Sequence, residues 1–331
     1  SLVNMWNGVT AAIPMPNYLV QLLFSVLSVC VMAVGISIYL VYHFTPALYP
    51  IGPACHRIVS VGQRVMISIM LFLQFLMVSP HDLRLTRWHL YAVLFQLLAS
   101  FGIALAVMHT PHGEIRILLE CAMICLICPT AAAAGVITDR LGGSLSATMT
   151  YVVIINTVAT FAIPTMIPLI HPSAELGFWQ YVLGIAAKIF PLLLLPCLLA
   201  WTIRYSARGL QRYLMRRAHW AFFFWGIGLT LAMILATRAL VTSRLGVGVI
   251  ICIVLVSIAV CALQFFAGRH LGRNRPECIT SGQALGQKNT GFMIWLGYAY
   301  LTPITSVAGG LYAVWQNIFN SWELYRHGHG K

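Results

Sequence analysis

A single lysine lies within a short polar stretch, GQALGQKNTG, at residues 282–291 of a very apolar chain. Glycines, side-chain amides and a hydroxyl surround Lys288 there, and the apolar run FMIWLGYAYL follows directly. An ammonium group at the centre of a bilayer costs roughly 2.5–3.5 kcal/mol on insertion scales, so such a lysine is a candidate for function, and the chemistry it offers is the binding of an anion. The alternative is a structural lysine that reaches an interface or pairs with a carboxylate such as Glu120.

Three further polar side chains inside apolar runs are candidates for a site. Asn156 either hydrogen-bonds across helices or belongs to a binding site. Glu120 is either a proton-coupled partner of a lysine or a solvated residue near a helix end. Lys188 is a second cation in an apolar run. It either faces a cavity or forms a structural ion pair, and the sequence favours neither role.

Patterns that would indicate a metal site or an enzyme are weak. Cys121, Cys125 and Cys128 share helical spacing, but no histidine completes a metal-ligand set and Glu120 is the only nearby carboxylate, so we expect these thiols to pack as small apolar groups. The apolar runs contain no paired carboxylates, no Ser/Lys pair at helical spacing and no HExxH motif. We therefore expect no catalytic residues, no metal and no cofactor.

The composition is that of an integral membrane protein. Of 331 residues, 60% are hydrophobic and 8% are charged, whereas soluble domains have about a quarter charged residues. Apolar runs of about 20 residues, long enough to cross a bilayer as helices, recur between short polar joints. We expect ten spans, at 19–42, 57–79, 88–108, 115–138, 145–170, 177–203, 219–241, 245–267, 276–299 and 301–323.

Basic residues favour the joints of one side of the membrane. Thirteen of them lie on that side: Arg84, Arg87, Arg140, Arg204, Arg208, Arg212, Arg216, Arg217, Arg269, Arg273, Arg275, Arg326 and Lys331. Five lie on the other side: Arg57, Arg64, Arg116, Arg238 and Arg244. The positive-inside rule then places both termini in the cytoplasm of a multi-pass protein of the cell inner (plasma) membrane. The same asymmetry explains most of the net charge of +13 without a nucleic acid partner, and we expect a monomer in the lipid bilayer.

The most basic joint divides the chain into two halves of five spans. We expect an N-terminal segment (1–18), a first five-helix repeat (19–170), a joint region (171–218) with the span 177–203 and the cytoplasmic linker 204–218, the rest of the second repeat (219–323) and a C-terminal tail (324–331). Because five is odd, the second half is inserted upside down relative to the first. Inverted repeats of this kind are typical of transporters whose site lies where interrupted helices meet.

The fourth span of each half is predicted to be interrupted. CPTAAAAGV, at 128–136, contains Pro129, which lacks a backbone donor, and SGQALGQKNTG, at 281–291, contains three glycines. The alternative is a pair of ordinary glycine-bearing packing faces, which are common in membrane helices.

These segments resemble the bile acid:sodium symporter (BASS) family, in CPTAAAAG, LGQKNTG, LSATMT (145–150), LFQ (94–96) and VWQNIFNS (314–321). The resemblance covers nearly the whole chain and implies panel and core domains, with helices 4 and 9 discontinuous and crossing, and alternating access for bile acids, steroid conjugates or small carboxylates. Together with the polar residues inside the apolar runs, it leads us to expect two sets of site residues. The substrate-binding set is Lys288, Asn289, Thr290, Gln287, Thr130 and Asn156. The ion- or proton-coupling set is Lys288, Gln96, Ser146, Thr150 and Glu120.

The chain departs from the family at the sodium ligands. The family's serine, asparagine and glutamate align with Ala134, Gly135 and Ala284, and a glutamine aligns with Lys288. Hard cations need several converging oxygens, which these residues do not offer as side chains. One protonated lysine carries the same net charge as one glutamate with two sodium ions, so we expect Lys288 to replace the cation in a sodium-independent transporter. The alternatives are a sodium symporter with relocated ligands and a non-transporting sensor or enzyme on this fold.

Overall fold

The computed structural model describes residues 17–131, 133–217 and 220–329, and within them the chain is all-helical, with 14 α-helices and no strand. The helices of the first half are α2 (Asn17–Phe44), α3 (Gly52–Met77), α4 (Arg87–His109), α5 (Glu114–Ile127), α6 (Ala134–Arg140) and α7 (Leu145–Ile170). Those of the second half are α8 (Phe178–Leu193), α9 (Leu195–Ser206), α10 (Arg208–Arg216), α11 (Trp220–Thr242), α12 (Val247–Leu271), α13 (Arg275–Gly286), α14 (Thr290–Tyr300) and α15 (Thr305–His329). Two short 3-10 helices, η1 (Pro46–Ile51) and η2 (Pro80–Asp82), precede α3 and α4.

Each apolar run of the sequence coincides with one helix or with two consecutive helices. The run at 145–170 is α7 itself, whereas 115–138, 177–203 and 276–299 are each divided into two helices. In the described chain, six helices are long and apolar enough to span a membrane, or seven if α8 and α9, which meet at 40°, count as one span. The N-terminal segment 1–18 falls almost entirely outside the described residues. The prediction of a C-terminal tail at 324–331 is wrong for residues 324–329, because these belong to the helix α15.

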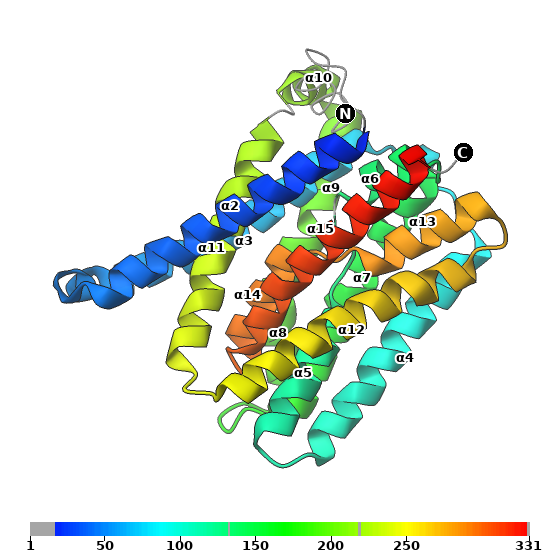
Figure 1. Ribbon diagram of the computed structural model, residues 1–331. Coiled ribbons are helices and arrows are strands. Elements are labelled where there is room, and N and C mark those ends of the chain that lie inside the picture. Colours follow the sequence, from blue (N-terminus) through cyan, green and yellow to red (C-terminus); the bar gives the residue numbers. More distant parts are fainter. Residues whose placement is uncertain (1–16, 132, 218–219, 330–331) are drawn as a thin grey trace.

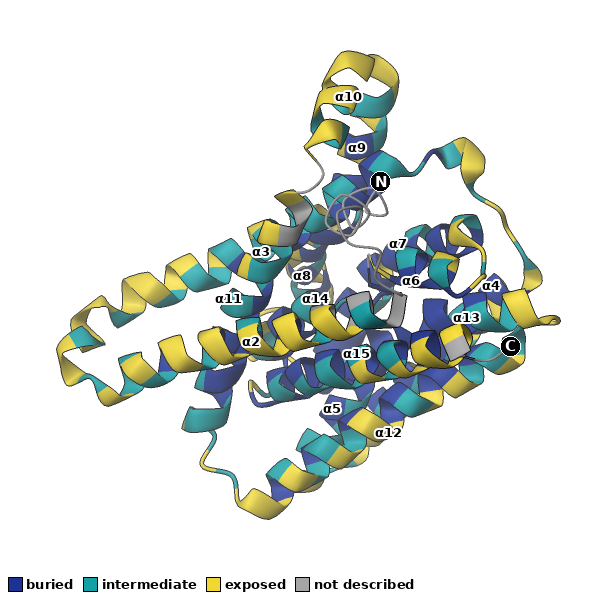
Figure 2. Ribbon diagram, turned by 45° about the horizontal axis from the view of Figure 1, so that its top comes forward, coloured by how far each residue is buried: buried dark blue, intermediate teal, exposed yellow. Residues whose placement is uncertain are grey.

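The helices pack in two groups that share one interface. In the first group α2 packs on α11, and α11 and α9 pack on α3. In the second group α12 packs on α13 and α5, α4 packs on α5 and α7, and α7 also packs on α13, whereas α14 and α15 contact both groups. The beginning of α2 and the end of α15 lie toward the same end of the bundle (Figure 1). Figure 2 shows that peripheral helices such as α2 and α10 expose much of their surface, and on α2 the exposed side chains include Leu22, Val26 and Val29, as expected for contact with lipid.

Glycines allow the very close approach of α12 and α13. A Cβ atom added to Gly268 would lie 2.5 Å from the carbonyl oxygen of Ser281, and one added to Gly286 would lie 2.4 Å from the ring of Phe265. Small residues at helix contacts let backbones approach closely inside a membrane. The alternative interpretation of Gly282 and Gly286 as packing residues is therefore correct, because both are part of the helix α13.

We expect Gly268→Ala to destabilise the protein by about 1–3 kcal/mol, because the added methyl group meets backbone atoms that have no free space to move into. The matched control is Gly102→Ala in α4, where a Cβ atom has no neighbour within 4 Å and alanine favours the helix. Thermal unfolding of the two variants in the same detergent measures the difference. Equal midpoints would contradict the packing argument.

Candidate functional site

Two helix breaks form the centre of the candidate site, and local sequence explains both. α5 ends because Cys128 is extended (φ −60°, ψ 139°) before Pro129, which also lacks an N–H group. In the second half, Gln287 is extended after α13 (φ −83°, ψ 123°). α14 then begins at a cap in which the Asn289 side chain accepts a hydrogen bond from the backbone N–H of Phe292 (3.1 Å).

The two breaks lie antiparallel and exchange backbone hydrogen bonds. The amide of Ala131 donates to the carbonyl of Gln287 (3.1 Å), and the amide of Asn289 donates to the carbonyl of Pro129 (2.9 Å). Both apolar runs are thus interrupted and the interruptions meet, as expected. The non-helical parts are shorter than expected and cover, among the described residues, 128–131, 133 and 287–289.

We call the contact between the two breaks the crossing, and we call α5 and α13, the helices that end there, half-helices. Thr130 and Lys288 face each other at the crossing. The side chain of each reaches a carbonyl near the end of the half-helix that belongs to the other break. The Thr130 hydroxyl donates to the carbonyl of Ala284 in α13 (2.6 Å). The Lys288 ammonium donates to the carbonyl of Leu126 in α5 (3.3 Å) and to the Oε1 atom of Gln96 (2.8 Å). The lysine is 0% exposed and has no ion-pair partner among the described residues. Its charge is stabilised by an amide oxygen and by the negative end of the α5 helix dipole.

Gln96 is oriented so that its oxygen faces the ammonium group. Its Nε2 group donates to the carbonyls of Ile127 and Cys128, both at 3.1 Å, and the Tyr151 hydroxyl donates to its Oε1 atom (3.1 Å). A reversed amide would place N–H groups against the ammonium group. Gln96 therefore connects the end of α5 to Lys288.

The second half contains a corresponding glutamine and tyrosine without a cation. Gln264 of α12 donates to the carbonyl of Cys125 and to the hydroxyl of Tyr312, both at 3.0 Å. The Tyr312 hydroxyl donates in turn to the carbonyl of Gly286 at the end of α13 (2.7 Å). The end of α5 thus accepts from both glutamines and the end of α13 accepts from Tyr312, and a lysine lies beside the first glutamine–tyrosine pair.

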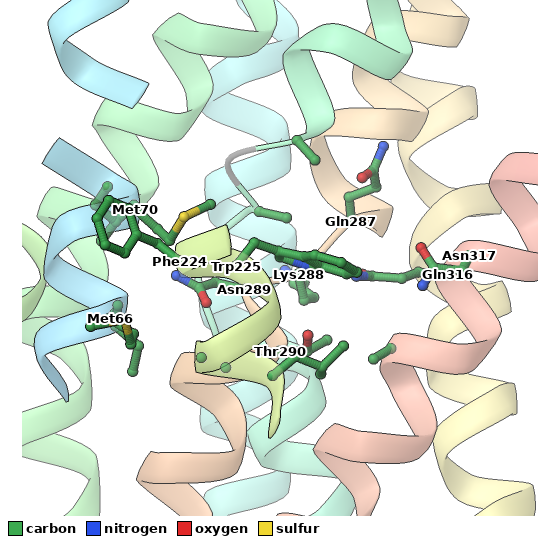
Figure 3. Close-up of a pocket in the computed structure, with 18 of the residues that line it drawn as sticks. Met66, Met70, Phe224, Trp225, Gln287, Lys288, Asn289, Thr290, Gln316 and Asn317 are labelled. Atoms are coloured by element: carbon green, nitrogen blue, oxygen red, sulfur yellow. The ribbon is translucent and has the colours of Figure 1, made fainter. Parts of the chain in front are cut away.

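A cavity of about 160 Å³ lies between the crossing and the first helix group (Figure 3). One wall is apolar, with Met66 and Met70 from α3 and Phe224 and Trp225 from α11. The opposite wall is rich in amides and comes from the second break and α15; its polar side chains are Gln287, Asn289, Thr290, Gln316, Asn317 and Asn320. Lys288 belongs to this wall, but its side chain has no exposed surface.

Two buried oxygens in the cavity wall lack a hydrogen-bond donor among the described residues. Gln63 of α3 donates from Nε2 to the carbonyl of Gly291 (3.2 Å), which leaves its Oε1 atom unpaired. The Oδ1 atom of Asn320 is also unpaired. Such acceptors cost about 1–3 kcal/mol each when left buried and unbonded.

The structure brings together six of the predicted site residues: Lys288, Gln96, Thr130, Gln287, Asn289 and Thr290. Ser146 and Thr150 lie away from them. The Ser146 hydroxyl donates to the carbonyl of Asp82, and Thr150 accepts from the amide of Arg84 (2.8 Å), so both hold the joint before α4. Asn156 is buried in α7, bonds within its own helix and is not part of the cavity wall.

Glu120 is part of a separate polar cluster and does not pair with Lys288. It accepts from Arg116 (3.4 Å), from the backbone N–H of Thr302 (3.0 Å) and from the His171 ring (3.0 Å). It lies about two helical turns before the end of α5, which explains why it does not reach the crossing.

Lys188 also lies away from the cavity. Its side chain is exposed, and its ammonium group is 5.8 Å from the centre of the Tyr300 ring. This is within the range of a cation–π contact, which at an exposed site contributes about 0.5–1 kcal/mol.

Four amide side chains of the cavity were not identified from the sequence: Gln63, Gln316, Asn317 and Asn320. A signal for the last three is their spacing in VWQNIFNS, where they occupy one face of an apolar helix. Amides on one face of an apolar helix indicate that this face makes a polar contact. They do not indicate whether the partner is a ligand or another helix.

Comparison with known protein families gave no match, and comparison with curated proteins gave none either. The functional argument therefore depends on the geometry of the crossing and of the cavity.

We expect the contact between Gln96 and Lys288 to appear as a coupling energy of about 1.5–3 kcal/mol, because a hydrogen bond to a charged group is stronger than one between neutral groups. A double-mutant cycle of Gln96→Leu and Lys288→Met, measured by thermal or denaturant unfolding, gives this energy. Gln264→Leu is the matched control, since Gln264 has neutral partners. Additive effects of Gln96→Leu and Lys288→Met would show that the ammonium does not depend on Gln96.

Proposed function

We propose that the protein is a secondary transporter of an organic anion, working by alternating access with the organisation of the BASS family. The observation that carries the proposal is the contact of two interrupted helices beside a cavity that is apolar on one wall and amide-lined on the other. Irregular backbone at membrane depth is tolerated where protein buries it or where it lines a cavity, and transporters bind substrate at such breaks.

An arrangement of two inverted repeats is supported by equivalent helix contacts in the two halves. α4 packs on α5 as α12 packs on α13, and α3 packs on α9 as α11 packs on α2. α7 likewise packs on α8 as α15 packs on α2. The two glutamine–tyrosine pairs also lie on equivalent helices, α4 with α7 and α12 with α15. We therefore retain ten spans, with both termini in the cytoplasm, as part of the proposal.

The proposed substrate carries an anionic group and at least one hydrogen-bond donor. The N–H groups of Thr290 and Gly291 begin α14, lack acceptors within the helix, and lie in the cavity wall at the positive end of the helix dipole. No carboxylate belongs to that wall as described. The unpaired oxygens of Gln63 and Asn320 suit donors of the same ligand, and the apolar wall suits its hydrocarbon part.

In this proposal Lys288 occupies the place of a coupling cation. Its ammonium group contacts an amide oxygen and a backbone carbonyl, the kinds of ligand that bind hard cations. Ala134, Gly135 and Ala284 offer no side-chain oxygen for sodium. The rival within the same class is a sodium symporter with ligands elsewhere, and the rivals from other classes are a membrane sensor and a membrane enzyme.

We expect the replacement of sodium by choline or potassium to leave substrate uptake nearly unchanged, because the cation of the site is part of the chain. The test begins with a thermal-shift screen of bile acids, steroid sulfates and short carboxylates. A labelled hit is then followed into liposomes that contain the purified protein. A steep and saturable requirement for sodium would favour the symporter with relocated ligands, and the absence of any uptake for all hits would favour a sensor or an enzyme.

We expect anion affinity to fall as pH rises, and Lys288→Gln to remove this dependence. A bound anion favours the protonated lysine, so substrate and proton raise each other's affinity by the same factor. The measurement is the affinity of a screened anion between about pH 5 and 9 for the wild type, for Lys288→Gln and for the control Lys188→Gln, whose lysine is exposed elsewhere. Identical curves for the wild type and Lys288→Gln would show that Lys288 is a structural cation.

A further inference from the structure

A second cavity lies at the corner between α9 and α10, away from the crossing. It has a volume of about 520 Å³. Its basic walls are Arg204 from α9 and Arg208 and Arg212 from α10, and Ser79 and His81 complete it from the joint before α4. The arginines keep a four-residue spacing across the change of direction at Ala207, which brings them to one cavity.

Hydrogen bonds fix this corner against the end of α3. Arg204 donates to the carbonyl of Leu76 (3.2 Å), and the indole of Trp201 donates to the carbonyl of Val78 (3.2 Å). On the opposite wall the Tyr205 hydroxyl and the His81 ring are hydrogen-bonded at 2.8 Å. The cavity is therefore formed by side chains with defined partners.

The charged side chains of the cavity wall are all of one sign. No carboxylate belongs to the cavity wall, and none of the three arginines has an ion-pair partner within the described chain. The segment 204–217 contains five arginines and no acidic residue. Neighbouring like charges repel, and planar guanidinium groups bind phosphate oxygens with two parallel hydrogen bonds. The cavity thus favours a phosphate-type anion.

The position of the cavity indicates where this anion comes from. α8 and α9 together are long and apolar enough to count as one membrane span, and α9 ends at Ser206. The basic segment follows directly, so the cavity lies beside the end of this span. α10 is strongly amphipathic: Arg208 and Arg212 lie on one side, and the exposed apolar residues Leu210 and Tyr213 lie on the other. A short basic helix of this kind lies in the plane of the membrane interface, with its apolar side toward the acyl chains.

We propose that the cavity between α9 and α10 binds the phosphodiester headgroup of an anionic phospholipid. The arginines contact the phosphate while the apolar side of α10 contacts the acyl region, which is the arrangement that anionic leaflets favour for basic interfacial segments. Since Trp201 and Arg204 hold the end of α3, the bound lipid fixes the first helix group relative to the bilayer. This site does not depend on the proposed transport function.

The test compares phosphatidylglycerol with phosphatidylcholine of the same acyl chains, added to the purified full-length protein in detergent. Bound lipid is counted by native mass spectrometry, and thermal unfolding is followed in parallel. We expect phosphatidylglycerol to bind and stabilise more than phosphatidylcholine, and Arg208→Gln/Arg212→Gln to weaken its binding by about tenfold or more, as expected for lost charge-assisted hydrogen bonds. The matched control is Arg216→Gln/Arg275→Gln, which removes the same charge from exposed residues outside the cavity.

Three results would overturn the proposal. Equal binding of the two lipids would exclude a headgroup site, and equal losses in the two double variants would show diffuse attraction to the membrane surface. Stabilisation by inorganic phosphate alone that matches phosphatidylglycerol would assign the cavity to a soluble anion. If the double variant does not fold, the single variants Arg212→Gln and Arg216→Gln carry the same comparison.

Discussion

The antiparallel contact of the two helix breaks is the constraint on which the rest of the structure depends. In an apolar environment an unpaired N–H or C=O group costs several kcal/mol, so neither break is stable alone. Together they satisfy each other through Ala131, Gln287, Asn289 and Pro129. The carbonyls that remain at the half-helix ends accept from side chains of α4, α12 and α15, so the crossing also fixes which helices surround it.

The two breaks make equivalent hydrogen bonds at the crossing, but one of them carries a charged side chain and the other does not. Thr130 and Lys288 each bond the end of the opposite half-helix, but one carries a hydroxyl and the other an ammonium group. Separating α5 from the second break would remove the partners of a buried charge, and breaking such contacts is strongly destabilising. In the proposed cycle, the helices of the crossing therefore move as one unit. In the proposed cycle, displacement takes place at the apolar wall, where Gln63 of α3 donates to the carbonyl of Gly291 of α14.

The sequence was sufficient to predict the helices and to place both breaks, because hydropathy and Pro129 act locally. The second break is predicted from its glycines, however, and is formed instead at the Asn289 cap, which the sequence analysis does not identify. It was not sufficient to predict which polar side chains meet. Ser146, Thr150 and Asn156 are polar residues of one apolar run, but their bonds within α7 or to the joint before α4 depend on how α7 packs. Gln63 is the opposite case, because it belongs to the cavity wall and the sequence does not indicate this. Its hydrogen bond to Gly291 exists only because α3 packs beside a residue that is far away in sequence. The glycines of α13 were assigned to the break although they serve contact with α12, because glycine permits both and only the packing distinguishes them.

In the proposed transporter, a lysine in place of a coupling ion changes what can drive transport. A sodium ion that binds and leaves with the substrate adds the free energy of its gradient, whereas an ammonium group attached to the chain returns unchanged in every cycle. The proton on that lysine can still be exchanged, so a proton gradient is coupled only if Lys288 is deprotonated at one stage of the cycle. If it stays protonated throughout, the anion gradient alone sets the direction, and the protein works as a uniporter or an exchanger. Because Gln96 and the end of α5 stabilise the charged form in the state described, deprotonation requires that these contacts loosen when the substrate leaves. The strength of the bond between Gln96 and Lys288 therefore decides between the two modes.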